Sequence, residues 1–197
     1  MKFLESNCSF EVLDEALINS TNVFECSNFD LNDFFQNDSI AFASELMGKS
    51  YCFTLDSDSK NIVCSFTISN DSIKTSILPN ARKKKLLKNI PSEKRFKSYP
   101  AVLIGRLGVS KDFTSLGIGT ELLNFIKSWF IERDNKTGCR FIIVDSYNTN
   151  EALNFYQKNG FNFLFSSEEQ EKMATDFGSE EQIKTRLMYF DLISLYS

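Results

Sequence analysis

The chain has 197 residues and a net charge of −4, and its length fits one domain that can bury a core without disulfide staples. It contains no histidine, which excludes Cys-His and Ser-His nucleophile pairs, His-ligated zinc and a histidine general base. Its five cysteines form no Cys-x-x-Cys pair, so neither a disulfide framework nor a zinc ribbon is indicated. Cys64 and Cys139 lie in apolar runs, which favours buried free thiols over a catalytic cysteine.

The N-terminal residues contain no apolar stretch long enough for a secretion signal, and no run approaches the roughly 18 apolar residues of a membrane span. We therefore expect a cytoplasmic protein without a membrane partner. No internal repeat and no linker rich in Pro, Gly or Ser divides the sequence. Residues 1–197 are expected to form a single domain.

The first fifty residues are expected to be helical, with Asn28 or Asp30 as a helix cap and Gly48 at the end of the region. Two short runs rich in aromatic and β-branched residues follow, at 51–55 and 62–69. The Asp-Ser-Asp-Ser sequence between them predicts a β-hairpin.

A basic block occupies residues 82–97, where eight cationic residues face Glu93 alone and give a net charge of +7. The rest of the chain then carries −11. We expect this block to be an irregular or partly helical excursion that ends at Pro100. A basic block on an acidic body is informative about partners rather than about the fold.

The second half of the sequence alternates strands and helices and predicts a mixed α/β domain. The expected elements are a buried strand at 101–109, an amphipathic helix at 119–133, a central strand at 141–144, a helix at 150–159 capped by Gly160, and strands at 161–165 and 186–193 around an acidic loop at 166–182.

The Gly117-Ile118-Gly119 turn lies between an expected strand and an expected helix. Glycines at such a turn let the backbone approach a ligand, and the free N–H groups of the helix start attract phosphate oxygens. Alone, the pattern is more often plain turn chemistry. It is neither a dinucleotide fingerprint, which needs a third Gly, nor a P-loop.

Two longer segments resemble the GNAT superfamily of N-acetyltransferases. The first is Gly105-Arg106-Leu107-Gly108-Val109 followed by residues 113–119 and a helix, which is similar to the acetyl-CoA motif. The second is residues 150–161, with the ending Phe-Tyr-x-x-x-Gly-Phe. The resemblance implies a GNAT-type fold, a central mostly antiparallel mixed sheet with a splayed strand pair and flanking helices.

The resemblance also implies an acetyl-CoA site. The pantetheine arm would pair with the backbone of Leu107 and Val109, amides from Leu116 on would hold the pyrophosphate, and Asn150 would line the far side. The implied cofactor-binding residues are Leu107, Gly108, Val109, Thr114, Leu116, Gly117, Ile118, Gly119, Thr120 and Asn150. The sequence departs from the family at Thr114, where Gln or Arg is usual, and at Leu116, where a basic residue is usual. We therefore expect weaker cofactor binding than in a typical member.

The reaction implied is direct attack of a primary amine on the thioester in a ternary complex, with no metal. Tyr156 would protonate the departing CoA thiolate, since a tyrosine with an ordinary pKa near 10 is protonated at pH 7. Without the resemblance, Tyr156 is more simply a core aromatic. Asp145 is a candidate base, although it is also well placed simply to end a strand.

The acceptor stays open. Within the superfamily, residues 24–35, 102–107 and 138–140 are similar to the GNAT-fold toxins that acetylate the α-amine of aminoacyl-tRNA and pair with an antitoxin, although Ser27 replaces the usual Gly and Asn32 the usual Asp. The basic block fits an RNA acceptor, but it also fits a solvated loop. A small-molecule acetyltransferase and a non-catalytic acyl-CoA-binding module remain alternatives, and the protein is expected to be a monomer or a homodimer. The candidate RNA contacts are Arg82, Lys83, Lys84, Lys85 and Lys88.

Overall fold

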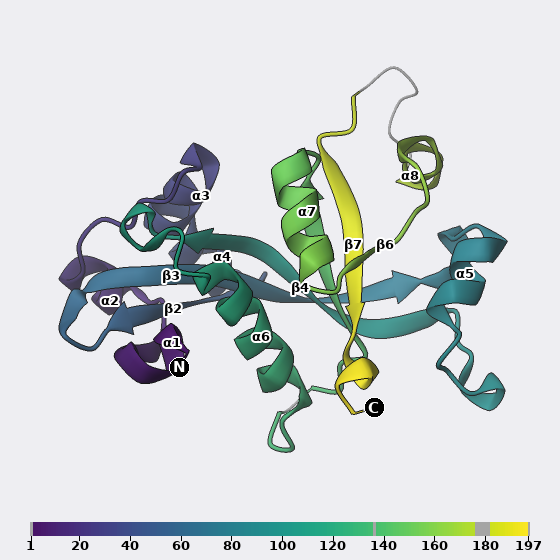
Figure 1. Ribbon diagram of the computed structural model, residues 1–197, viewed down its shortest axis with the longest axis horizontal. Coiled ribbons are helices and arrows are strands. Elements are labelled where there is room, and N and C mark those ends of the chain that lie inside the picture. Colours follow the sequence, from purple (N-terminus) through teal and green to yellow (C-terminus); the bar gives the residue numbers. More distant parts are fainter. Residues whose placement is uncertain (1, 136, 176–181, 197) are drawn as a thin grey trace. The chain divides into compact units, whose positions relative to one another are not determined.

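The computed structural model describes residues 2–135, 137–175 and 182–196 (Figure 1). The chain divides into two compact units, each described by itself: unit 1 holds residues 1–69 and 104–132, and unit 2 holds residues 70–103 and 133–197. The described strands form one sheet in the order β1-β2-β3-β4-β5-β7-β6. Two long strands, β3 (Asp58–Lys74) and β4 (Ser98–Val109), have residues in both units. The expectation of a single domain stays a prediction.

Unit 1 begins with two short helices that flank a strand. In chain order its elements before β3 are α1 (Phe3–Asn7), β1 (Cys8–Val12), α2 (Glu15–Ser20), α3 (Phe29–Asp33), a π-helical turn (Phe34–Asp38), α4 (Ser39–Ser44) and β2 (Lys49–Leu55). The end of β4 is followed by a 3-10 turn (Lys111–Phe113) and by α6 (Ile118–Ile131). In Figure 1, α1 lies against α6.

The expectation of a purely helical N-terminal region is wrong at β1. This strand pairs antiparallel with β2 over its whole length, from Cys8 opposite Leu55 to Val12 opposite Tyr51. Its partner lies about forty residues further along the chain, so no local sequence pattern predicts the pairing. The Asn28 cap is confirmed, because its side-chain oxygen accepts a hydrogen bond from the N–H of Leu31 at 3.1 Å.

The predicted hairpin is confirmed as the antiparallel pair β2 and β3. β3 starts already at Asp58 and continues to Lys74, well beyond the expected end. A core of buried residues forms between the hairpin and the helical segment, and it includes Phe24, Phe34, Phe35, Cys52 and Ile62. The tilted and perpendicular ring pairs among the phenylalanines are the arrangement that aromatic side chains favour.

Unit 2 carries the basic block and the C-terminal half of the sheet. Its elements are a 3-10 turn (Thr75–Ile77), α5 (Asn80–Leu86), a 3-10 turn (Ser92–Lys94), β5 (Phe141–Tyr147), α7 (Asn150–Lys158), β6 (Asn162–Phe163), α8 (Glu168–Thr175), β7 (Thr185–Asp191) and a 3-10 turn (Leu192–Leu195). β7 pairs antiparallel with both β5 and β6. A buried core gathers side chains of α5, β4, β5 and β7, among them Leu86, Tyr99, Phe141 and Tyr189.

Three expectations about unit 2 need correction. Residues 168–175 form α8 rather than a loop, because the buried carboxylate of Glu171 accepts hydrogen bonds from Arg186 at 2.7 Å and from the N–H of Leu187 at 2.6 Å. The rest of the expected acidic loop, at 176–181, lies outside the described residues. The strand expected at 161–165 is only two residues long. Pro100 lies inside β4 instead of before it.

The mixed α/β class is confirmed. No helix in the described ranges is long and apolar enough to cross a membrane.

Candidate active site

The turn between β4 and α6 is strained in the way a ligand-binding turn can be. Ser115 and Gly117 both adopt positive φ, 68° and 75°, and Gly117 is the N-cap of α6. A left-handed serine is uncommon, whereas glycine adopts this conformation at little cost. The sequence indicated Gly117 but not Ser115, because a serine does not by itself predict a positive φ.

The N-terminus of α6 presents backbone N–H groups without a side-chain cap. The N–H of Glu121 makes the first intrahelical bond, to the carbonyl of Gly117 at 3.1 Å. The preceding amides, those of Ile118, Gly119 and Thr120, therefore have no acceptor within the helix. The carboxylate of Glu121 accepts a hydrogen bond from the N–H of Leu4 at 3.1 Å. The helix start thus has the amides and the dipole end that bind phosphate groups.

The two positions that depart from the family contribute little through their side chains. Thr114 is exposed and donates its hydroxyl to the carbonyl of Lys111 at 3.1 Å. Leu116 is 56% exposed. These two side chains therefore add no positive charge for an anion at this turn.

The end of β4 is packed tightly on one side. A Cβ on Gly108 would lie 3.3 Å from the ring of Phe24 and 3.4 Å from the Sγ of Cys26. Residues 24–26 are fixed in turn by Asn32, whose amide bonds both the N–H and the carbonyl of Cys26, at 2.7 and 3.2 Å. Gly108 therefore lets the segment that precedes α3 approach β4, next to Leu107 and Val109.

In unit 2, Tyr156 lies on α7, which packs on β5. Its ring contacts Phe155 and Phe161 at centroid distances of 5.1 and 5.3 Å. Burial raises the pKa of Tyr156 to about 12, so the hydroxyl keeps its proton well above neutral pH. The residue as a whole is partly exposed.

Two other predicted site residues also belong to unit 2. Asn150 is exposed and is the first residue of α7, directly after the cap Thr149. Asp145 is exposed on β5, opposite Leu187 of β7. The strand continues to Tyr147, so the expectation that Asp145 ends it is wrong. The roles of Asn150, Asp145 and Tyr156 stay predictions.

The cysteines lack the properties of nucleophiles. All five thiols are free, and burial raises the pKa of each. Cys64 is fully buried as expected, whereas Cys139 is only half-buried. A raised pKa leaves the thiol protonated at neutral pH, which makes it a poor nucleophile.

The first part of the basic block is the helix α5, which is attached to the sheet, whereas residues 91–97 are exposed. Arg82 donates from Nε to the carbonyl of Leu164 at 3.0 Å and from Nη2 to the carbonyl of Phe163. Lys85 donates to the side-chain oxygen of Asn162 at 3.0 Å. These contacts attach α5 to β6 and to the residue that follows it.

Comparisons with known proteins agree with this architecture. The acetyltransferase (GNAT) domain family matches residues 84–163, from α5 to β6. Among curated proteins, none is significantly similar to the chain in sequence. The fold resembles that of AtaT complexed with acetyl-methionyl-tRNAfMet, with a TM-score of 0.66 and 18% identity over 96% of this chain and 97% of that chain.

Two further solved structures share the fold. A tyrosine-to-phenylalanine mutant of KacT has a TM-score of 0.67 and 17% identity, covering 97% of this chain and 98% of that chain. A tyrosine-to-phenylalanine mutant of the toxin AtaT, bound to the C-terminus of the antitoxin AtaR and to acetyl-CoA, has a TM-score of 0.60 and 15% identity, covering 96% and 98%. At these identities the likeness establishes the fold, which confirms the expected architecture.

Proposed function

We propose that this GNAT-type N-acetyltransferase transfers the acetyl group of acetyl-CoA to the α-amine of an aminoacyl-tRNA. The single observation that carries the proposal is the helix start of α6, where an uncapped set of amides follows a turn with two left-handed residues. The similar AtaT structures contain acetyl-CoA in one case and an acetylated aminoacyl-tRNA in another, which supports this choice of substrates.

The fit of acetyl-CoA to this chain rests on main-chain groups. A pyrophosphate needs several convergent N–H donors and a positive field, and the amides of Ile118, Gly119 and Thr120 provide both. Leu107 and Val109 would pair with the pantetheine arm from β4. The usual family residues at Thr114 and Leu116 are missing, so we expect the affinity for acetyl-CoA to be lower than in a typical member.

Acetyl transfer requires a neutral amine as the nucleophile and a proton donor for the departing CoA thiolate. The nitrogen of the amine attacks the thioester carbonyl carbon, the carbon–sulfur bond breaks, and Tyr156 gives its phenolic proton to the sulfur. The raised pKa of Tyr156 keeps this proton available, because the acid remains neutral at the working pH. An α-amine, with an ordinary pKa near 7.7–8.0, is partly neutral at pH 7, so a strong base is not required. Asp145 is the candidate that would take up the second proton.

The basic block favours an RNA acceptor over a small metabolite. A net charge of +7 within residues 82–97 would not attract a small neutral amine, whereas it would attract the phosphates of an RNA backbone. Antitoxin-bound AtaT also supports the proposal that this chain pairs with an antitoxin.

The experiment that tests the proposal compares aminoacyl-tRNA, polyamines and peptides as acceptors at one acetyl-CoA concentration. We expect transfer to the tRNA-linked α-amine and little to the other two. Faster transfer to a polyamine or a peptide would overturn the choice of acceptor. Acetyl-CoA binding without turnover on any amine would instead favour a non-catalytic acyl-CoA-binding module.

A further inference from the structure

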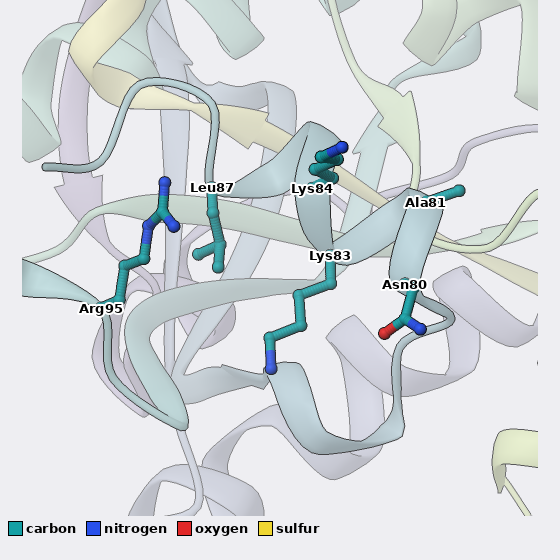
Figure 2. A pocket seen from close by; sticks show the side chains of 6 residues that line it. All are labelled: Asn80, Ala81, Lys83, Lys84, Leu87 and Arg95. Carbon is teal, nitrogen blue, oxygen red and sulfur yellow. The ribbon is translucent and has the colours of Figure 1, made fainter. Parts of the chain in front are cut away.

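The basic block contains a hollow that its charge alone did not predict. A depression of about 540 Å³ lies over α5 and the segment that follows it. Figure 2 shows its lining residues: Lys83 and Lys84 belong to α5, Leu87 follows that helix, and Arg95 follows the 3-10 turn Ser92–Lys94. Three of the six lining side chains are cationic, and Asn80 adds a polar amide.

The hollow lies on a fixed support. Leu86 and Leu87 are buried in the core of unit 2, with 3% and 6% of their surfaces exposed. Arg82 and Lys85 project from the same helix and are held by β6 and its next residue, through the carbonyls of Phe163 and Leu164 and the side chain of Asn162. The eight cations of the basic block therefore differ in position: two attach α5 to the sheet, three line the hollow, and the other three, Lys88, Lys94 and Lys97, do not line it.

The three lining cations keep their charge available. Among the ion pairs formed by the described residues, none involves Lys83, Lys84 or Arg95. The one acidic residue of the block, Glu93, accepts a hydrogen bond from the hydroxyl of Ser92 instead. Three cations that form no ion pair among the described residues attract a ligand with several negative charges.

We propose that this hollow binds consecutive phosphates of the RNA acceptor, with Lys83, Lys84 and Arg95 as the contacting cations. The proposal rests on the proposed function and makes it more specific. The lining offers charge rather than a shaped set of donors and acceptors, so the contact is to the sugar–phosphate backbone and is independent of base sequence. The volume exceeds what a single small anion needs, which favours an extended polyanion. Arg82 and Lys85 hold α5 instead, and Lys88 does not line the hollow, so these three are not part of the proposed contact.

The test is a binding measurement with deacylated tRNA, without acetyl-CoA, over a series of salt concentrations. The first variant replaces Lys83, Lys84 and Arg95 together by Ala. The matched control replaces Lys74, Lys94 and Lys97 by Ala, which removes the same charge from neighbouring exposed positions that do not line the hollow. The thermal midpoint of both variants is measured first, and we expect no loss because all six side chains lie outside the core.

We expect the hollow variant to bind tRNA about tenfold more weakly at low salt, and its slope of log K against log salt to fall by about 3. The control should lose less than about twofold. Equal losses in the two variants would overturn the proposal, because net charge alone would then explain the binding. Displacement of tRNA by poly-glutamate of equal charge at equal concentration would also overturn it, in favour of an acidic protein partner.

An acetylation assay of the same two variants with acetyl-CoA and aminoacyl-tRNA, beside the binding measurement, separates the two proposals. If tRNA binds at the hollow but aminoacyl-tRNA is not acetylated, the proposed function is contradicted and the proposed RNA site is supported. If both variants acetylate aminoacyl-tRNA with identical kinetics, the proposed RNA site at the hollow is contradicted and the proposed function is supported.

Discussion

The candidate site of unit 1 is made of main-chain groups, whereas that of unit 2 is made of side chains. In unit 1 the candidate site consists of main chain, with the end of β4, a turn containing two left-handed residues and the free amides of α6. In unit 2 it consists of side chains, namely the hydroxyl of Tyr156 and the cations of the hollow. A site made of amides tolerates the change of its side chains, whereas a site made of side chains loses its function with each one removed.

The difference explains why Thr114 and Leu116 need not abolish cofactor binding. The Thr114 hydroxyl donates to the local carbonyl of Lys111, and the Leu116 side chain is exposed. To destroy a backbone site, a substitution has to add bulk or charge. To destroy a side-chain site, a truncation is enough.

The largest effect is expected from Gly119→Glu, which places a side chain and a negative charge at the second position of α6. An acidic residue in the first turn suits a helix, so the free protein should keep its thermal midpoint. The rise in thermal midpoint with acetyl-CoA, several degrees at saturating ligand, should disappear. Leu116→Ala is the matched control and should keep most of this rise. A normal rise in Gly119→Glu would show that the pyrophosphate binds elsewhere.

Tyr156→Phe tests the side-chain half of the comparison. The ring and its contacts with Phe155 and Phe161 stay, and only the proton is lost. We expect kcat to fall by about 10²-fold with little change in acetyl-CoA binding, as for a general acid. Steady-state kinetics beside a thermal-shift titration measures both. An unaltered kcat would assign Tyr156 to the core alone.

Arg82→Ala separates the cations that hold α5 from those of the hollow. It removes the hydrogen bonds that Arg82 donates to the carbonyls of Phe163 and Leu164, and we expect a loss of about 1–3 kcal/mol in the free energy of unfolding. Lys84→Ala removes the same charge from an exposed residue that lines the hollow, so it should cost much less. Urea unfolding of both variants measures the difference. Equal stabilities would contradict the division of the basic block.

The smallest effect concerns pH. A tyrosine with a pKa near 10 would be half ionised at pH 10, but burial raises the pKa of Tyr156 to about 12. A raised pKa keeps the acid protonated to higher pH, so only about 1% is ionised at pH 10. We expect kcat to stay level between pH 9 and 10 with a hydrolysis-resistant, amide-linked aminoacyl-RNA. A twofold fall by pH 10 would mean that the acid is exposed.

Elements defined by local signals could be predicted from the sequence. α6 and α7 were expected nearly to their bounds, because each has an apolar stripe and a glycine at one end. Gly160 adopts φ +82°, as its place after α7 predicted. The hairpin of β2 and β3 was equally local, since its turn residues lie between two β-prone runs.

Elements that depend on distant partners could not be predicted. β1 exists because β2 pairs with it, and α8 is held by Arg186 and Leu187 of β7. The candidate site divides in the same way. The motif indicated Gly117 and Tyr156, but only the structure shows that Ser115 is left-handed and that Arg95 shares a hollow with Lys83.

The only tryptophan of the chain, Trp129 on α6, lies in unit 1 among aromatic rings of β1, β2 and β3. Its ring centroid is 5.2 Å from that of Phe10 and 5.0 Å from that of Tyr51. Tryptophan emission is therefore an intrinsic optical reporter of unit 1, whereas circular dichroism in the far ultraviolet reads both units together. If the two signals follow one denaturation curve, the chain unfolds as a single cooperative domain. If the curves separate, the two units melt independently, and the fluorescence trace gives the stability of unit 1 without any label.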